Sequence, residues 1–281
     1  MANPLHMRAE VLANQPEGAY RRLVLRAPGV PGRVRPGHFA ALAVGGPDSP
    51  LLARRAFALH RADPAAGTVE LVLDPAEAEG AGLADTPAGA ELDLLAPLGT
   101  PFPLPEGPVS ALLVGEESAA GPLLELGTEL RRRGGQLGFV LGAATAGRLH
   151  GVRRARELTG DVLVLTEDGS AGLAGEVSAP LAQAIEAIGA TVLYAAGRPH
   201  TLAAAARAAA DRAVRCHTAV RLPMPCGTGL CMGCVLPVVG ADGKPRSARA
   251  CTDGPVFDGA KVRWEQIGTV PADLESAGAR R

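Results

Sequence analysis

The stretch PCGTGLCMGC at residues 225–234 places three cysteines in one loop, and CTDGPVF at residues 251–257 adds a fourth. The four candidate ligands are Cys226, Cys231, Cys234 and Cys251. Their C-x4-C-x2-C…C spacing is the one associated with plant-type [2Fe–2S] ligation. Because four thiolates must converge on two irons, the loop has to wrap around the cluster with its amides directed at the sulfurs. The stretch therefore predicts a small iron–sulfur lobe near the end of the chain.

Three glycines in this loop, Gly227, Gly229 and Gly233, are expected to supply positive φ angles and a close backbone approach. A structural zinc site is the alternative, but paired zinc knuckles normally present two short cysteine arms. The remaining cysteine, Cys216, lies in an apolar, strand-like stretch. We interpret it as a buried small hydrophobe and not as a cluster ligand.

The length of 281 residues suggests two domains besides this lobe, since a domain typically holds roughly 100–200 residues. Residues 1–104 contain short apolar or alternating runs separated by Gly and Pro, which is typical of a small antiparallel β-barrel. Strands are expected at 20–25, 38–44, 57–59, 68–73 and 91–95.

Beyond the barrel the pattern changes to strands that alternate with helices. Strands are expected at 109–115, 137–141, 162–166 and 191–195, and helices at 118–133, 180–188 and 202–214. This alternation indicates βαβ crossovers and a doubly wound parallel sheet. The predicted organisation is a barrel at 1–104, an α/β domain of nucleotide-binding type at 105–214 and a [2Fe–2S] lobe at 215–281.

Composition and charge exclude several classes of protein. Hydrophobic residues make up 47% of the chain, which excludes disorder and collagen despite 36 Gly and 24 Pro. The net charge of −1 gives no electrostatic reason to expect nucleic acid or a membrane as a partner. No segment approaches the roughly 18 consecutive apolar residues of a membrane span, and the N-terminal sequence lacks the apolar stretch of a secretory signal. We therefore expect a soluble, cytoplasmic protein.

The cysteine motif and its flanks resemble a known family. MPCGTGLCMGC at 224–234 and CTDGPVF at 251–257 are similar to the electron-transfer subunit of the class 1B dihydroorotate dehydrogenases, within the ferredoxin reductase-like superfamily. TEDGSAGLAGEV at 166–177 also matches the family pattern almost completely. The resemblance extends along almost the whole chain and implies an FAD in the barrel domain.

Two stretches of the barrel segment carry the flavin resemblance. PGHF at 36–39 resembles the family's P-G-Q-F strand, and LARRAFAL at 52–59 resembles its flavin signature L-L-R-R-P-F-S-I. The resemblance implies that Arg55 pairs with the flavin pyrophosphate and that Phe57 packs on the flavin ring, although Arg55 taken alone suggests only a solvated surface residue. Ala58 replaces a Ser whose hydroxyl would bond near the flavin N5, so that hydrogen bond is absent here. The further FAD contacts that the resemblance implies are Leu71, Val72, Leu73 and Gly82.

The α/β segment departs most from the family. GEESAAGP at 115–122 replaces the family's G-G-G-I-G-x-A-P turn, in which glycines let a dinucleotide pyrophosphate approach a helix N-terminus. Glu116 and Glu117 stand at glycine positions, where carboxylates oppose a phosphate by charge and by bulk. The alternative interpretation is that they cap the following helix, because acidic groups are favourable at a helix N-terminus.

Other residues that would contact a dinucleotide are also changed. The family's G-x-R is GAA at 142–144, and its C-G-P-x-P-M is AGRPH beginning at Ala196. We therefore expect NAD(H) to bind weakly, if at all. Arg148 or Arg198 could replace the missing phosphate partner only by reaching it from another position.

The resemblance implies an oxidoreductase electron-transfer subunit that moves electrons between FAD and the cluster, with no complete substrate-converting site of its own. Its partner would be the FMN-containing catalytic subunit of dihydroorotate dehydrogenase, in pyrimidine biosynthesis. A cluster handles single electrons, and a flavin couples them to two-electron chemistry. Two alternatives remain: a reductase module of another oxidoreductase complex, and a non-enzymatic, metal-bound docking module.

Overall fold

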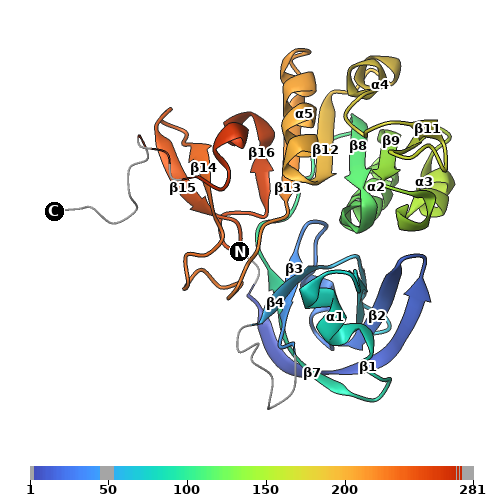
Figure 1. Cartoon of the computed structure of the whole chain (residues 1–281), viewed down its shortest axis with the longest axis vertical. Coiled ribbons are helices and arrows are strands. Elements are labelled where there is room, and N and C mark those ends of the chain that lie inside the picture. Colours follow the sequence, from blue (N-terminus) through green and yellow to red (C-terminus); the bar gives the residue numbers. More distant parts are fainter. Residues whose placement is uncertain (1–2, 45–53, 270, 272, 274–281) are drawn as a thin grey trace.

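The fold consists of a barrel-like antiparallel sheet, a doubly wound parallel sheet and a small two-stranded hairpin (Figure 1). The computed structural model describes residues 3–44, 54–269, 271 and 273. Leu52 and Ala53, which begin the flavin-type motif, lie outside the described residues. In Figure 1 the barrel lies below, the parallel sheet above it, and the hairpin beside the sheet. This architecture confirms the predicted fold class.

The first sheet is antiparallel, with the strand order β4-β3-β7-β1-β2-β6-β5. Its strands alternate between the core and the outer surface: Val69, Leu71 and Leu73 of β6 are buried, and the residues between them are half-buried. The elements of this domain are β1 (Leu5–Glu17), β2 (Tyr20–Arg26), β3 (Phe39–Leu42), β4 (Arg55–Ala58), β5 (Arg61–Asp63), β6 (Thr68–Leu73), α1 (Ala78–Ala84) and β7 (Glu91–Leu98). Alternate burial of this kind closes a single apolar core inside the barrel.

The longest barrel strand, β1, was not predicted from the sequence. It pairs with β2 on one side and with β7 on the other. Only Ala9 and Val11 of its thirteen residues are fully buried, and its register with β2 shifts between Val11 and Ala13. The alternation of apolar and polar residues that marks a strand therefore extends over too few positions of β1 to identify it from the sequence.

The second sheet has the order β11-β10-β9-β8-β12-β13-β16. Its first strand, β8, lies in the middle, because β9 and β10 add to one side and β12 and β13 to the other. The carboxyl ends of β8 and β12 therefore flank the topological switch point, where open parallel sheets bind their ligands. The strands are β8 (Ser110–Glu116), β9 (Gln136–Ala143), β10 (Val162–Thr166), β11 (Leu173–Ala174), β12 (Val192–Gly197), β13 (Arg215–Val220) and β16 (Val256–Asp258). The helices are α2 (Gly121–Arg132), α3 (Val152–Leu158), α4 (Leu181–Ala187) and α5 (Pro199–Ala210).

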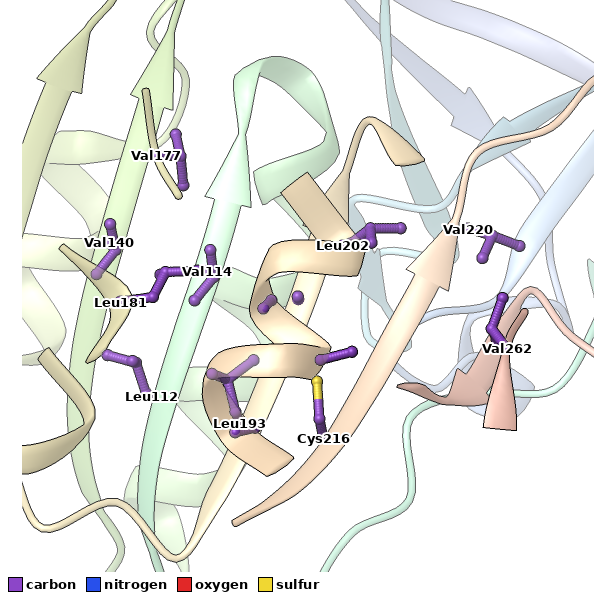
Figure 2. Close-up of a cluster of buried hydrophobic side chains, with 14 of the residues drawn as sticks. Leu112, Val114, Val140, Val177, Leu181, Leu193, Leu202, Cys216, Val220 and Val262 are labelled. Carbon is purple, nitrogen blue, oxygen red and sulfur yellow. The ribbon is translucent and has the colours of Figure 1, made fainter. Parts of the chain in front are cut away.

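Apolar side chains cover both faces of this sheet. Leu112, Leu193 and Cys216 belong to one core together with Leu181 of α4 and Leu202 of α5 (Figure 2). The opposite face packs Leu113 and its neighbours against α2. Strands buried on both faces become continuous apolar runs, which is why the sequence predicted them well. Burial raises the pKa of the Cys216 thiol to about 12, as expected for a core residue.

The C-terminal segment contributes to two sheets. Strands β14 (Val235–Val239) and β15 (Pro245–Arg249) form the separate hairpin. In contrast, β13 pairs with β12, and β16 pairs with β13. The parallel sheet thus continues beyond residue 214, although the sequence predicted a separate lobe at 215–281. Among the described residues, no helix has both the length and the apolar character needed to cross a membrane.

Candidate functional site

The cysteine loop, residues 226–234, directs backbone amides at its own sulfurs. The Cys226 sulfur accepts hydrogen bonds from the N–H groups of Thr228 and Cys231, at 3.4 and 3.5 Å. The Cys231 sulfur accepts one from Gly233, also at 3.4 Å. Burial opposes ionisation of Cys226, but the N–H groups of Cys231 and Thr228 outweigh it and lower the pKa of this thiol to about 6. Donors of this kind stabilise the thiolates that a cluster requires.

The four predicted ligands form two pairs. Cys226 and Cys231 are linked through the amide hydrogen bond, and the sulfurs of Cys234 and Cys251 lie 3.3 Å apart. Cys234 and Cys251 are both buried. Within the described part of the chain, no three His, Cys, Asp or Glu side chains converge around a single ion. The short distance between the sulfurs of Cys234 and Cys251 is compatible with two thiolates on one iron of a cluster.

The glycines of the loop agree only in part with the expectation. Gly227 and Gly229 have φ angles of 68° and 84°, which favour glycine. The third positive angle belongs to Met232, with φ 57°, and not to Gly233. Gly233 instead permits a close contact with Pro225, because a Cβ there would lie 3.1 Å from Cγ of Pro225.

A narrow cavity of about 140 Å³ separates the barrel from the parallel sheet, and we call it the interdomain cavity. Its lining includes Phe39, Phe57, Ala58 and Val72 of the barrel, and Ser118, Ala119 and Ala196 of the sheet domain. Antiparallel pairing of β3 with β4 sets Phe39 opposite Ala58. The walls are mainly apolar, as is usual for small-molecule sites.

A wider cavity of about 540 Å³ continues outward from the first, and we call it the outer cavity. The two cavities share Ala56, Arg221, Leu222 and Met224. The outer cavity also holds Arg55, and Arg221 forms an ion pair with Glu77. Burial raises the pKa of Glu77, against the influence of Arg221. The carboxylates of Glu77 and Glu79 line the same cavity, so a diphosphate would be bound there by charge-assisted hydrogen bonds from the two guanidinium groups only if it displaced Glu77 from Arg221.

Not all predicted flavin contacts face these cavities. Arg55, Phe57, Ala58 and Val72 line one or the other. The side chains of Leu71 and Leu73 point into the barrel core instead, because they alternate with Val72 along β6. Gly82 lies in α1 against Val44, whose Cγ1 would be 2.3 Å from an added Cβ.

His38 was not predicted from the sequence as a site residue; it lines the interdomain cavity and is 1% exposed. Its Nδ1 accepts a hydrogen bond from the Arg35 N–H at 3.0 Å. Burial lowers the pKa of His38 to about 4, so the ring is neutral and its proton resides on Nε2. Nε2 has no hydrogen-bond partner among the described residues. A polar residue between PG and an apolar strand was the signal that could have identified it.

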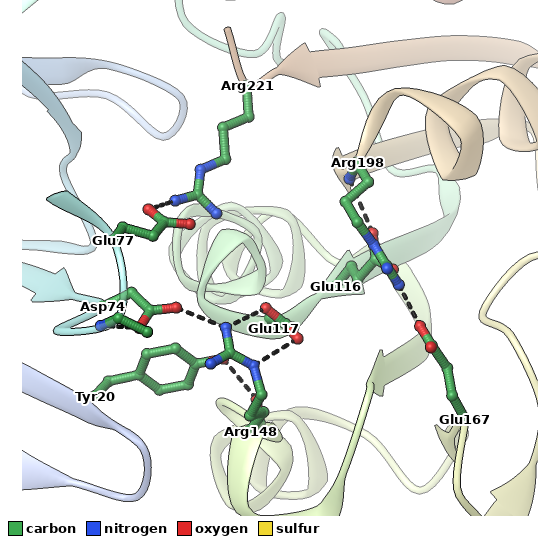
Figure 3. Close-up of polar contacts among 10 residues, drawn as sticks. Tyr20, Asp74, Glu77, Glu116, Glu117, Arg148, Glu167, Arg198 and Arg221 are labelled. Atoms are coloured by element: carbon green, nitrogen blue, oxygen red, sulfur yellow. Dashed lines mark hydrogen bonds and ion pairs between the residues drawn. The ribbon is translucent and has the colours of Figure 1, made fainter. Parts of the chain in front are cut away.

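Glu116 and Glu117 lie at the carboxyl end of β8 and pair with arginines (Figure 3). Arg198 binds Glu116, and Arg148 binds Glu117. The helix-cap interpretation holds only in part: Glu117 lies in the first turn of the 3-10 segment preceding α2, but Glu116 makes no side-chain cap hydrogen bond where that segment begins. Both arginines reach the turn from other positions in the chain, but each is paired with a carboxylate.

Comparison with known proteins identifies relatives over most of the chain. The family model for the iron–sulfur cluster binding domain of dihydroorotate dehydrogenase B matches residues 223–263. The electron transfer subunit of dihydroorotate dehydrogenase B (NAD(+)) from Bacillus caldolyticus is 34% identical over 231 residues, which cover 81% of this chain and 86% of the relative. A probable subunit of the same kind from Methanopyrus kandleri is 31% identical, with 95% of both chains covered.

Solved structures agree on the fold. The structure of an NADH-dependent reduced ferredoxin–NADP oxidoreductase is similar with a TM-score of 0.78 and 24% identity, over 92% of this chain and 91% of that one. An Amycolatopsis cytochrome P450 reductase gives a TM-score of 0.59 at 20% identity, over 75% of this chain and 67% of that one. These likenesses establish a ferredoxin reductase-like arrangement of barrel and parallel sheet.

Proposed function

Since the chain belongs to the family of electron transfer subunits of dihydroorotate dehydrogenase B, we propose that it carries electrons between an FAD and a [2Fe–2S] cluster. The FAD lies between the barrel and the parallel sheet, and the cluster lies in the cysteine loop. The partner is the FMN-containing catalytic subunit that oxidises dihydroorotate in pyrimidine biosynthesis. This chain supplies the path for electrons and not the site of substrate conversion.

One observation carries the proposal: the two cofactor regions share a wall. Met224 lines both cavities, and Pro225 lines the outer one immediately before Cys226. Gly227 packs on the barrel, since a Cβ there would lie 3.4 Å from the Phe39 ring, which itself lines the interdomain cavity. A flavin in the cavity and a cluster in the loop are therefore separated by little more than one layer of side chains.

Different residues around the two cavities bind the diphosphate and the ring system of FAD. Arg55 and Arg221 hold the diphosphate in the outer cavity, where Arg221 exchanges its Glu77 partner for phosphate. Phe57 and Val72 form the apolar wall for the ring system. His38 lines the same cavity as Ala58, and a rotation of its buried ring would bring the Nε2–H, which has no partner among the described residues, to the flavin in place of the absent hydroxyl. When bound, the flavin couples one-electron transfer to two-electron chemistry.

The surface around the cysteine loop suits a protein partner. Leu230 is 85% exposed, and Met232 and Val235 are 44% and 42% exposed. Exposed large apolar side chains grouped around a redox centre mark an interaction surface. The cluster thus lies where the catalytic subunit docks. A cysteine set that ligates a cluster suits the reducing cytoplasm, where we place the protein.

The proposal is tested with full-length protein purified anaerobically, alone and after co-expression with the catalytic subunit. We expect stoichiometric FAD, two irons and acid-labile sulfide per chain, and a stable complex of the two subunits. Colourless protein with bound zinc would instead support a docking module. Protein with both cofactors and no affinity for the catalytic subunit would point to another oxidoreductase partner.

Replacing Arg55 with alanine is expected to weaken FAD binding by roughly tenfold to a hundredfold, or about 1.5–3 kcal/mol, because a charge-assisted phosphate contact is lost. The dissociation constant is measured by flavin fluorescence after dilution. Arg26→Ala is the matched control, since this barrel arginine is 57% exposed and pairs with Glu10 on the outer surface. Equal flavin retention in both variants would remove Arg55 from the site.

A further inference from the structure

The switch point of the parallel sheet is where a dinucleotide would bind, and here it is filled by side chains. Glu116 ends β8, and Arg198 directly follows β12. These are the two strands that flank the switch point. In nucleotide-binding domains this crevice is lined by glycines, so that a pyrophosphate can reach the amides of the following helix.

Glu116 is bound on every side. Its side chain is 3% exposed. One carboxylate oxygen accepts hydrogen bonds from the Arg198 backbone N–H at 2.8 Å and from the Thr201 hydroxyl at 3.1 Å. The other accepts from the Arg198 guanidinium, with Nε at 2.8 Å. The same carboxylate covers Gly197, where an added Cβ would lie 2.8 Å from Oε2. The space above this glycine is therefore occupied by the protein itself.

Glu117 occupies the second half of the turn in a backbone conformation that glycine would favour. Its φ angle is 52°, in the left-handed region that is unfavourable for a residue with a side chain. Arg148 compensates with two hydrogen bonds to the carboxylate, from Nε at 2.8 Å and from Nη2 at 2.7 Å. Arg148 also binds Asp74 of the barrel domain at 2.6 Å (Figure 3). The turn is thus held from both domains.

The charges at this turn disfavour a further anion. The carboxylates of Asp74, Glu116, Glu117 and Glu167 surround the guanidinium groups of Arg148 and Arg198. The hydrogen bonds from Arg148 keep the pKa of Glu117 below its ordinary value, so this carboxylate stays ionised at neutral pH. Four carboxylates exceed two guanidinium groups, and a pyrophosphate would add charge of the same sign as the excess.

We infer that the second domain binds no pyridine dinucleotide, because Glu116 and Glu117 occupy the pyrophosphate position and consume Arg198 and Arg148 as counterions. The chain therefore differs from its relatives, whose names specify NAD(+). The α/β domain has kept the fold of a nucleotide site and uses the turn to fix its position against the barrel. Exchange of hydride with NAD(H) is then not part of its reaction, and the two electrons from each dihydroorotate leave the reduced FAD toward an acceptor other than a pyridine nucleotide. Dinucleotide binding is independent of the proposed cofactor content, and only the flavin readout below rests on the proposed function.

The test compares full-length wild-type protein with Glu116→Gly/Glu117→Gly, which restores glycines at both positions. Binding of NADH and of NADPH is measured by calorimetry, which requires no flavin. We expect no saturable binding by the wild type below about 1 mM. The double glycine variant should bind NADH at least tenfold more tightly, since it opens the turn and releases both arginines for phosphate. Flavin reduction by NADH, followed in the visible spectrum with dithionite as the positive control, should increase in parallel.

Two further variants separate the effect of the carboxylate charge from the effect of side-chain bulk. Glu116→Gln/Glu117→Gln removes the charge but keeps the bulk, and it should gain less affinity than the glycine pair. Glu186→Gln removes an ion-paired carboxylate on α4, 2.7 Å from Arg212, and should gain none. Micromolar binding of either dinucleotide by the wild type overturns the inference, and so does a folded glycine variant without increased affinity. If that variant fails to fold, the dinucleotide affinities of the wild type and of the glutamine variant still test the inference. Absence of FAD or iron would refute only the proposed function.

Discussion

Changing Cys251 to serine is expected to abolish the rhombic electron-spin resonance signal of the reduced cluster, or to shift it strongly. The sulfur of Cys251 lies 3.3 Å from that of Cys234, and both residues are buried. No other cysteine is close enough to substitute, because the fifth cysteine, Cys216, belongs to the core of the parallel sheet. Electron transfer from FAD to a partner protein should be lost with the cluster, while direct reduction of the flavin by dithionite persists.

Cys216→Ser is the matched control for this prediction. It replaces the same sulfur by oxygen, but at a cysteine that is 4% exposed and packs among Leu193, Leu202 and their neighbours. The signal should be retained, and the cost should appear only as lower stability, since a buried hydroxyl needs a hydrogen-bond partner. A normal signal in Cys251→Ser together with its loss in Cys216→Ser would overturn the ligand assignment.

The sequence could predict those parts of the fold in which the local pattern and the tertiary environment agree. The strands β8, β9 and β12 are buried on both faces, so nearly every residue in them is apolar. The cysteine loop could be predicted for a different reason. Its ligands are close together in the chain, and its spacing follows from the geometry of the cluster.

Contacts between distant segments could not be predicted in this way. Arg148 binds Asp74, which is 74 residues away, and Glu117, which is 31 residues away. Nothing in the local sequence of Arg148 distinguishes it from a solvated arginine. The sequence did show that carboxylates replace glycines in the turn, but only the fold shows which cations neutralise them. The side-chain direction of Leu71 and Leu73 likewise depends on which face of β6 closes the barrel.

Replacing Arg148 with methionine is expected to destabilise the protein more than the loss of any surface ion pair. Methionine preserves much of the volume but leaves Asp74, which is 3% exposed, and Glu117, which is 18% exposed, without their cation. Removing one partner of a buried ion pair costs about 3–5 kcal/mol, and we expect about 2–4 kcal/mol here because Arg148 is itself 27% exposed. The free energy of unfolding is measured by urea denaturation with probes in both domains. Arg153→Met, at an arginine that is 89% exposed and pairs only with Glu157 among the described residues, should cost less than about 0.5 kcal/mol.

The pH dependence of this loss distinguishes the ion pair from packing. Arg148 holds the pKa of Glu117 below its ordinary value of 4.5 in the folded protein. A carboxyl with a lowered pKa contributes stability that is present above its unfolded pKa and is lost as the pH falls through the folded value. The difference in stability between wild type and Arg148→Met should therefore be largest near neutral pH and should decrease as the pH falls below 4.5. Adding Glu117→Gly to Arg148→Met should restore part of the stability at neutral pH, because it removes both the unpaired carboxylate and the strained φ of 52°. A loss that stays constant as the pH falls well below 4.5 would show that Arg148 acts by packing against Tyr20, whose ring centre lies 5.4 Å from its guanidinium carbon, and not through the charge of Glu117.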